Sequence, residues 1–122
     1  MNKFIGKQAY QQTVQAPVIN DPHGAITVCL NTLLQGLQFL SRNNDRASET
    51  AVKTSSKCLT AVYVLQTSLD FDKGGEIANK LFQLYEYVKY QVLSLSKGDE
   101  SANIESAAEV ISEILNTWKT IK

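Results

Sequence analysis

Residues 68–78 read Ser68-Leu69-Asp70-Phe71-Asp72-Lys73-Gly74-Gly75-Glu76-Ile77-Ala78, and apolar residues at helical spacing both precede and follow this stretch. Gly74 and Gly75 can adopt left-handed backbone conformations without a steric penalty, so we expect them to end one helix and turn the chain sharply. Glu76 would then lie in the first turn of the next helix, where a negative charge complements the helix dipole. The stretch therefore predicts the bend of a helical hairpin.

Helical periodicity extends outward from this bend in both directions. Asn20-Asp21-Pro22 is typical of a helix start, because an Asn or Asp cap is followed by proline at the first helical position. Lys97-Gly98-Asp99 is expected to end the third helix and cap the fourth. The chain divides into an N-terminal arm, residues 1–20, and a bundle, residues 21–122, with helices over about 22–42, 45–71, 75–97 and 100–121.

Four helices joined by short loops predict an all-α fold, an antiparallel up-down-up-down four-helix bundle with an N-terminal arm or short cap helix. Apolar residues three and four positions apart mark the side of each helix that faces the core. The expected core residues are Ile26, Leu30, Leu33, Leu37 and Leu40; Ala51, Ser55, Cys58, Val62, Leu65 and Leu69; Ile77, Leu81, Leu84, Val88 and Leu95; and Ile104, Ala108, Ile111, Leu115 and Trp118.

The overall composition is that of one globular domain. The chain has 122 residues, of which 43% are hydrophobic and 20% charged, and its twelve basic and twelve acidic residues cancel. A balanced charge argues against a nucleic-acid partner and favours association with other proteins. No apolar run approaches the length that membrane insertion requires, and the first residues lack the apolar core of a signal peptide, so a cytoplasmic location is expected.

Three of the expected helices carry more apolar surface than one four-helix core can bury. The first has no charged residue from Pro22 to Ser41, and the second has none from Cys58 to Leu69. Such an excess predicts apolar grooves that accept amphipathic helices from a partner. The large apolar residues on the outer faces of the second and third helices are Val64, Phe71, Phe82, Tyr90 and Leu93.

The residue types that catalysis or metal binding needs are not grouped in this sequence. The only histidine, His23, is expected to be an exposed residue in the first turn of a helix, where the dipole disfavours its protonated form. Cys29 and Cys58 lie in apolar patterns without a second metal ligand nearby, so we expect buried thiols. Gly74-Gly75 lacks the Gly-Lys-Ser/Thr of a phosphate loop. We therefore predict a protein that is not an enzyme and needs no cofactor or metal.

The bend resembles that of the FliS family of flagellar secretion chaperones, which hold flagellin before export. The shared pattern is Leu69-Asp70, then Gly74-Gly75-Glu76-Ile77-Ala78, then Leu84-Tyr85 with Tyr87 after it. Ala9-Tyr10-Gln11-Gln12 is similar to the family's N-terminal tyrosine motif, and Trp118 matches a tryptophan near the end of its last helix. The first helix departs from the pattern, since the family usually has Ser-Pro and a Met-Leu-Tyr-acidic-Gly run there.

The resemblance implies a cytosolic helical bundle that binds the C-terminal segment of flagellin and passes it to the flagellar export apparatus. Val64, Phe71, Phe82, Tyr90 and Leu93 would line the grooves for flagellin helices. Tyr10 would hold the N-terminal arm over part of a groove in the free protein and move when flagellin binds. Gly74 and Gly75 would serve the bend alone.

Two other functions fit parts of the sequence. A helical adaptor or co-chaperone of secretion would show the same grooves with another client. A phosphotransfer four-helix module would need an exposed histidine in the middle of a helix, whereas His23 is at a helix end. The sequence leaves open whether the free protein is a monomer or a homodimer.

Overall fold

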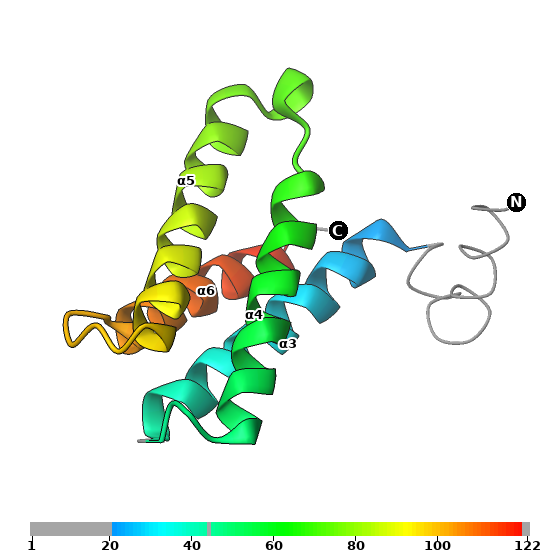
Figure 1. The fold of residues 1–122 in the computed structure, drawn as a ribbon. Helices are drawn as coiled ribbons and strands as arrows, with labels where there is room; N and C mark the ends of the chain where they lie inside the picture. The colour runs from blue at the N-terminus through cyan, green and yellow to red at the C-terminus, as the bar shows by residue number, and fades with distance from the viewer. Residues whose placement is uncertain (1–20, 44, 121–122) are drawn as a thin grey trace, which may run out of the picture.

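The computed structural model describes residues 21–43 and 45–120, and these form four α-helices joined by short connections (Figure 1). The arm of residues 1–20, with Tyr10, lies outside the described residues. The helices are α3 (Pro22–Arg42), α4 (Glu49–Thr67), α5 (Phe71–Ser96) and α6 (Ile104–Lys119).

Each helix packs against two others in a ring. α3 contacts α4 and α6, and α5 also contacts α4 and α6. In Figure 1 successive helices run in opposite directions, so the chain passes up and down through the bundle. The prediction of an all-α four-helix bundle is confirmed.

The core is centred on the leucines of α3. Leu30, Leu33 and Leu37 are completely buried, as is Val62 of α4. Gly36 allows the close approach of α3 to α4, because a Cβ atom built on it would lie 2.5 Å from the Sγ atom of Cys58. Leucine at spacings of three and four therefore packs one face of α3 against both neighbouring helices.

Side-chain caps move two helix starts away from the expected positions. α4 begins at Glu49 rather than near residue 45, because the Ser48 side chain accepts a hydrogen bond from the backbone N–H of Ala51. α6 begins at Ile104 rather than residue 100, because Asn103 caps it by accepting from the N–H of Ser106. The residue expected to cap α6, Asp99, instead accepts hydrogen bonds from Ser101 in the loop.

The bend between α4 and α5 also lies earlier than the sequence suggested. α4 ends at Thr67 rather than residue 71, and α5 begins at Phe71, where the Asp70 side chain accepts from the N–H of Lys73. Gly75 interrupts α5 with φ 50° and ψ −122°, so residues 71–74 form a separate helical turn. Figure 1 shows this turn at the tip of the α4–α5 hairpin, followed by a change of direction. The glycines therefore bend the start of α5; they do not terminate α4.

Candidate functional site

An apolar concavity lies where the α4–α5 hairpin meets the start of α3 and the end of α6. It is a hollow of about 360 Å³. Apart from the polar groups of the bend, its walls are apolar. Its apolar lining residues are Ile26, Leu30, Leu65, Leu69, Ile77, Ala78, Leu81, Tyr85, Ile114 and Trp118.

A second hollow, of about 410 Å³, continues from the first between α5 and α6. Ile77, Leu81, Ile114 and Trp118 line both hollows, so the two form one surface. We call this combined surface the Trp118 groove. Its outer part is completed by Glu113 and Thr117 of α6.

The Trp118 groove is open because α5 and α6 are joined at only one end. Near the loop between them, the N–H of Asn103 donates to Oε1 of Gln91 at 2.7 Å. One turn further along, the Tyr87 hydroxyl donates to Oγ of Ser106 at 2.9 Å. Beyond this bridge the two helices are separated by the groove, and no other part of residues 21–43 and 45–120 covers the first turns of α5 on that side.

Ile77 projects from this uncovered part of α5. Its side chain is 70% exposed, the highest value among the large apolar residues of the described chain. The sequence placed Ile77 and Leu84 in the core, and both expectations are wrong, since Leu84 is 38% exposed. Ala78 and Tyr85, each one position further along the chain, are buried instead, together with Val92. The expected core residue Val88 is completely buried. Of the expected residues, Ile77 and Leu81 line the groove.

Trp118 is held in place by His23 at the start of α3. The two rings stack with centroids 4.5 Å apart and an angle of 10° between their planes. The indole Nε1 donates to the carbonyl of His23 at 3.1 Å, and Nε2 of His23 lies 3.0 Å from the carbonyl of Trp118, as donor in the tautomer that carries the proton there. The expectation that His23 is an idle exposed residue is wrong. It fixes one wall of the groove.

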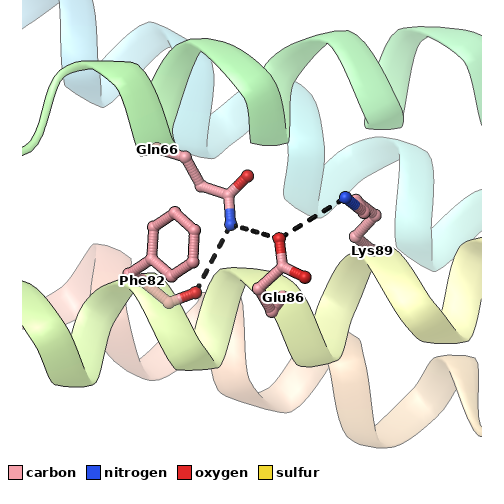
Figure 2. Close-up of polar contacts among 4 residues, drawn as sticks. All are labelled: Gln66, Phe82, Glu86 and Lys89. Carbon is pink, nitrogen blue, oxygen red and sulfur yellow. Dashed lines mark hydrogen bonds and ion pairs between the residues drawn. The ribbon is translucent and has the colours of Figure 1, made fainter.

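The opposite wall, the α4–α5 hairpin, is held by a polar contact across the two helices (Figure 2). Nε2 of Gln66 donates to Oε2 of Glu86 at 2.8 Å and contacts the carbonyl of Phe82 at 3.4 Å. Lys89 forms an ion pair with the same carboxylate at 3.4 Å. The hydrogen bond from Gln66, with a smaller contribution from Lys89, holds the pKa of Glu86 below its ordinary value.

The five described residues that the sequence assigned to grooves lie outside the Trp118 groove. Val64 lines a separate hollow of about 380 Å³ between α3 and α4, together with Val28 and Cys29. Phe71 and Phe82 pack edge to face, with ring centroids 6.1 Å apart, at the hairpin. On α5, Tyr90 is 61% exposed and Leu93 is half-buried.

The residues that do line the groove were assigned to the core from their spacing. Ile77, Leu81 and Trp118 satisfied the helical period, and Ile114 was not singled out at all. A periodic pattern gives no sign of where two helices diverge, so the sequence offered no means of separating a core stripe from a groove stripe here.

The floor of the groove is neutral. Burial raises the pKa of Tyr85 to about 12, with a smaller contribution from Cys29, so its hydroxyl keeps its proton near neutral pH. Burial also raises the pKa of the neighbouring core thiol Cys58 to about 12. Within residues 21–43 and 45–120 no three His, Cys, Asp or Glu side chains converge as metal ligands would. Nor is any helix of that part of the chain both long and apolar enough to span a bilayer.

Comparison with known proteins gives a consistent result. The family model described as "Flagellar protein FliS" matches residues 6–122. The chain is 30% identical to the flagellar secretion chaperone FliS of Salmonella typhimurium, over 95% of this chain and 89% of that protein. It is 22% identical to the flagellar secretion chaperone FliSB of Pseudomonas aeruginosa, over 94% and 93% of the two chains. No solved structure matches the chain significantly.

The match to the family model covers nearly the whole chain, including the bend, the groove and Trp118. The helical bundle of the structure agrees with the fold that the resemblance implied. This chain is a member of the FliS family of flagellar proteins.

Proposed function

We propose that this protein is a cytoplasmic export chaperone that binds the C-terminal segment of flagellin, prevents its premature polymerisation and delivers it to the flagellar export apparatus. The observation that carries the proposal is the Trp118 groove. Ile77, Leu81, Ile114 and Trp118 form a continuous apolar surface beside a fully formed core. An unfilled apolar surface of this kind favours a protein partner.

The groove suits an amphipathic helix. Its walls are two helices, and its exposed residues are aliphatic with one aromatic ring at the end, the arrangement found where a helix lays its apolar face into a groove. A client segment that is unstructured before binding would gain helix as it buries this face. The names of the Salmonella and Pseudomonas relatives, flagellar secretion chaperones, support a client that is exported through the flagellum.

Other apolar residues are proposed as secondary contacts. Val64 would receive a further client segment in the hollow between α3 and α4, and Phe71, Phe82, Tyr90 and Leu93 would contact it along the hairpin and α5. Tyr10, which lies outside the described residues, would hold the N-terminal arm over a groove until the client arrives. Gly74 and Gly75 are proposed to serve the bend, and Gly74 also lines the first hollow of the groove.

The test is a titration with a peptide that covers the C-terminal helices of flagellin from the same organism. Calorimetry gives the stoichiometry and the heat-capacity change, and far-UV circular dichroism gives the helix gained. Trp118 is the only tryptophan, so its emission reports directly on occupation of the groove. A one-to-one complex with negative heat-capacity change, added helicity and altered Trp118 emission is expected. Absence of binding at tens of micromolar would reject flagellin as the client and favour an adaptor for another secreted protein.

The phosphotransfer alternative is disfavoured by the geometry of His23. A phosphoryl acceptor must present an imidazole nitrogen to solvent and to an incoming donor. Nε2 of His23 instead contacts the Trp118 carbonyl, and the ring face is covered by the indole. In the proposed chaperone, His23 instead holds Trp118 in place in the groove wall.

A further inference from the structure

The α6 rim of the Trp118 groove is acidic, whereas the α5 side carries charges of both signs. On the α5 side, Asp70 and Lys73 line the groove, and Glu76 lies one turn before Lys80. On α5, Lys80 follows Ile77 by three residues and precedes Leu84 by four, so the three share one side of the helix. On α6, Glu113 lines the groove, and Glu109 lies one turn before it on the same side. Lys80, Glu109 and Glu113 are all exposed.

These rim charges have no partner within the described part of the chain. The ion pairs of residues 21–43 and 45–120 are Lys53 with Glu49 and Lys89 with Glu86, and both lie on other surfaces. Because the unpaired carboxylates of Glu109 and Glu113 lie on the α6 rim and the α5 side carries both signs, the electrostatic potential differs across the width of the groove. A helix lying in the groove would interact with these charges along its flanks.

We propose that the Trp118 groove binds an amphipathic helix whose apolar stripe has basic residues on the flank facing α6, and that contact with the acidic rim of α6 sets the direction in which the helix lies. Turning a helix end for end exchanges its two flanks. A helix with one basic and one acidic flank is therefore matched in one direction and opposed in the other. The inference rests on the proposed function, because it names the chemistry of the segment that the chaperone would bind.

The size of the effect follows from the exposure of the rims. Exposed ion pairs are weak and are screened by salt, so each matched contact should change affinity only about two- to five-fold. The apolar contacts supply most of the affinity, and the charges select direction and partner. Specificity of this kind is lost at high ionic strength while binding itself persists.

The experiment uses the full chain and three designed helical peptides with the same length and apolar stripe. One has a basic left flank and an acidic right flank, the second has these flanks exchanged, and the third has glutamine on both flanks. Each peptide is made with a nitroxide at either its N- or its C-terminus, and quenching of Trp118 shows which end lies at the Trp118 end of the groove. We expect both charged peptides to bind more tightly than the glutamine peptide at low salt, and the quenching end to reverse when the flanks are exchanged.

Variants separate the rims from the fold. Glu109→Gln with Glu113→Gln should abolish the reversal, because it removes the acidic rim, and should lower the affinity for the charged peptides toward that for the glutamine peptide. Lys80→Gln should preserve the reversal, because the acidic rim of α6 still selects the basic flank. Glu100→Gln, which removes one carboxylate from the α5–α6 loop away from the groove, is the control and should have no effect. Equal affinity for all three peptides with no reversal would overturn the inference while leaving the groove as a binding site. Failure of every peptide to bind or to change Trp118 emission would overturn the groove itself, and the proposed function with it.

Discussion

His23 and Trp118, 95 residues apart in the sequence, each make a hydrogen bond to the other's backbone carbonyl while their rings stack at 4.5 Å. The pair joins the first turn of α3 to the last turn of α6. Both helix ends would otherwise fray, because terminal backbone groups lack partners within the helix. Since Trp118 is also a wall of the groove, the same contact that closes the bundle shapes the surface on which a client would bind.

Replacing His23 with alanine should lower the free energy of unfolding by about 1–2 kcal/mol, because a stacked ring and a hydrogen bond are lost together. Trp118 emission should shift to longer wavelength in the native state as the indole becomes more exposed. Urea unfolding followed at the Trp118 emission maximum measures both effects.

Asp21→Ala is the control for this change. It removes the cap that accepts from the Gly24 N–H at the same end of α3. A loss of about 1 kcal/mol is expected from the missing cap, with native emission unchanged. A His23→Ala protein with wild-type emission and midpoint would show that the pair has no structural role.

Replacing the two adjacent glycines of the bend with alanine should lower the free energy of unfolding by different amounts. Gly75 has φ 50° and ψ −122°, a region that side chains other than glycine rarely adopt, so Gly75→Ala should cost about 1–3 kcal/mol. Gly74 is helical, and a Cβ there would lie 3.0 Å from the Cβ of Ala78, which a small shift can relieve. Gly74→Ala should therefore lower the free energy of unfolding clearly less than Gly75→Ala does. Equal unfolding free energies for the two variants would contradict the backbone argument.

The four-helix architecture could be predicted because its signal is local and repeated. Leu30, Leu33, Leu37 and Leu40 of α3 keep the helical period over about three turns, and all four are buried. Asp21 and Pro22 mark the start of α3, where the Asp21 side chain indeed caps the helix. Signals of this kind depend only on neighbouring residues, so no knowledge of the tertiary structure was needed.

The candidate site could not be predicted in the same way. Ile77 keeps the period of a core residue, yet α6 has diverged from α5 at that point and the side chain is left exposed. Tyr85 is buried although tyrosine is common at surfaces, and it takes the core place that the helical period assigned to Leu84. The contact between His23 and Trp118 depends on how the two ends of the bundle meet. Each of these facts belongs to the arrangement of helices and has no local sequence signal.

Alkaline pH should destabilise the protein through Cys58. Its pKa is raised from 9.0 to about 12 by burial, so the unfolded chain ionises first. The stabilisation is fully present below pH 9.0 and is lost as the pH rises toward 12, by up to about 1.4 kcal/mol for each pH unit. Tyr85, with its pKa raised from 10.0 to about 12, adds a similar loss above pH 10.0.

Cys58→Ala isolates the contribution of the thiol. The variant starts less stable at neutral pH because it leaves a cavity beside Gly36. The difference between wild type and variant should shrink between pH 9.0 and about pH 12, as measured by urea unfolding at each pH. Two parallel stability curves would show that the thiol ionises equally in both states.

Acid should weaken the contact between α4 and α5. The pKa of Glu86 is lowered mainly by the hydrogen bond from Gln66, so this stabilisation is present above the pKa of the unfolded state and is lost as the pH falls through that of the folded state. Gln66→Ala should raise the pKa of Glu86 toward its ordinary value, and Lys89→Gln should raise it less. Carboxyl chemical shifts followed by NMR during an acid titration measure both. A larger effect of Lys89→Gln would show that Lys89, and not the hydrogen bond from Gln66, is the main cause of the lowered pKa of Glu86.

The sharpest test of the groove compares two exposed aliphatic residues. Ile77 is 70% exposed and lines both hollows, whereas Val52 of α4 is 53% exposed and lines none of the hollows described above. Because neither side chain is in the core, Ile77→Glu and Val52→Glu should each change the free energy of unfolding by less than about 0.5 kcal/mol. Ile77→Glu should weaken binding of the flagellin C-terminal peptide about tenfold or more, since it places a charge in the apolar contact. Val52→Glu should leave the affinity unchanged, and calorimetric titration compares the two. Equal effects of the two variants on binding would mean that the client lies elsewhere on the bundle.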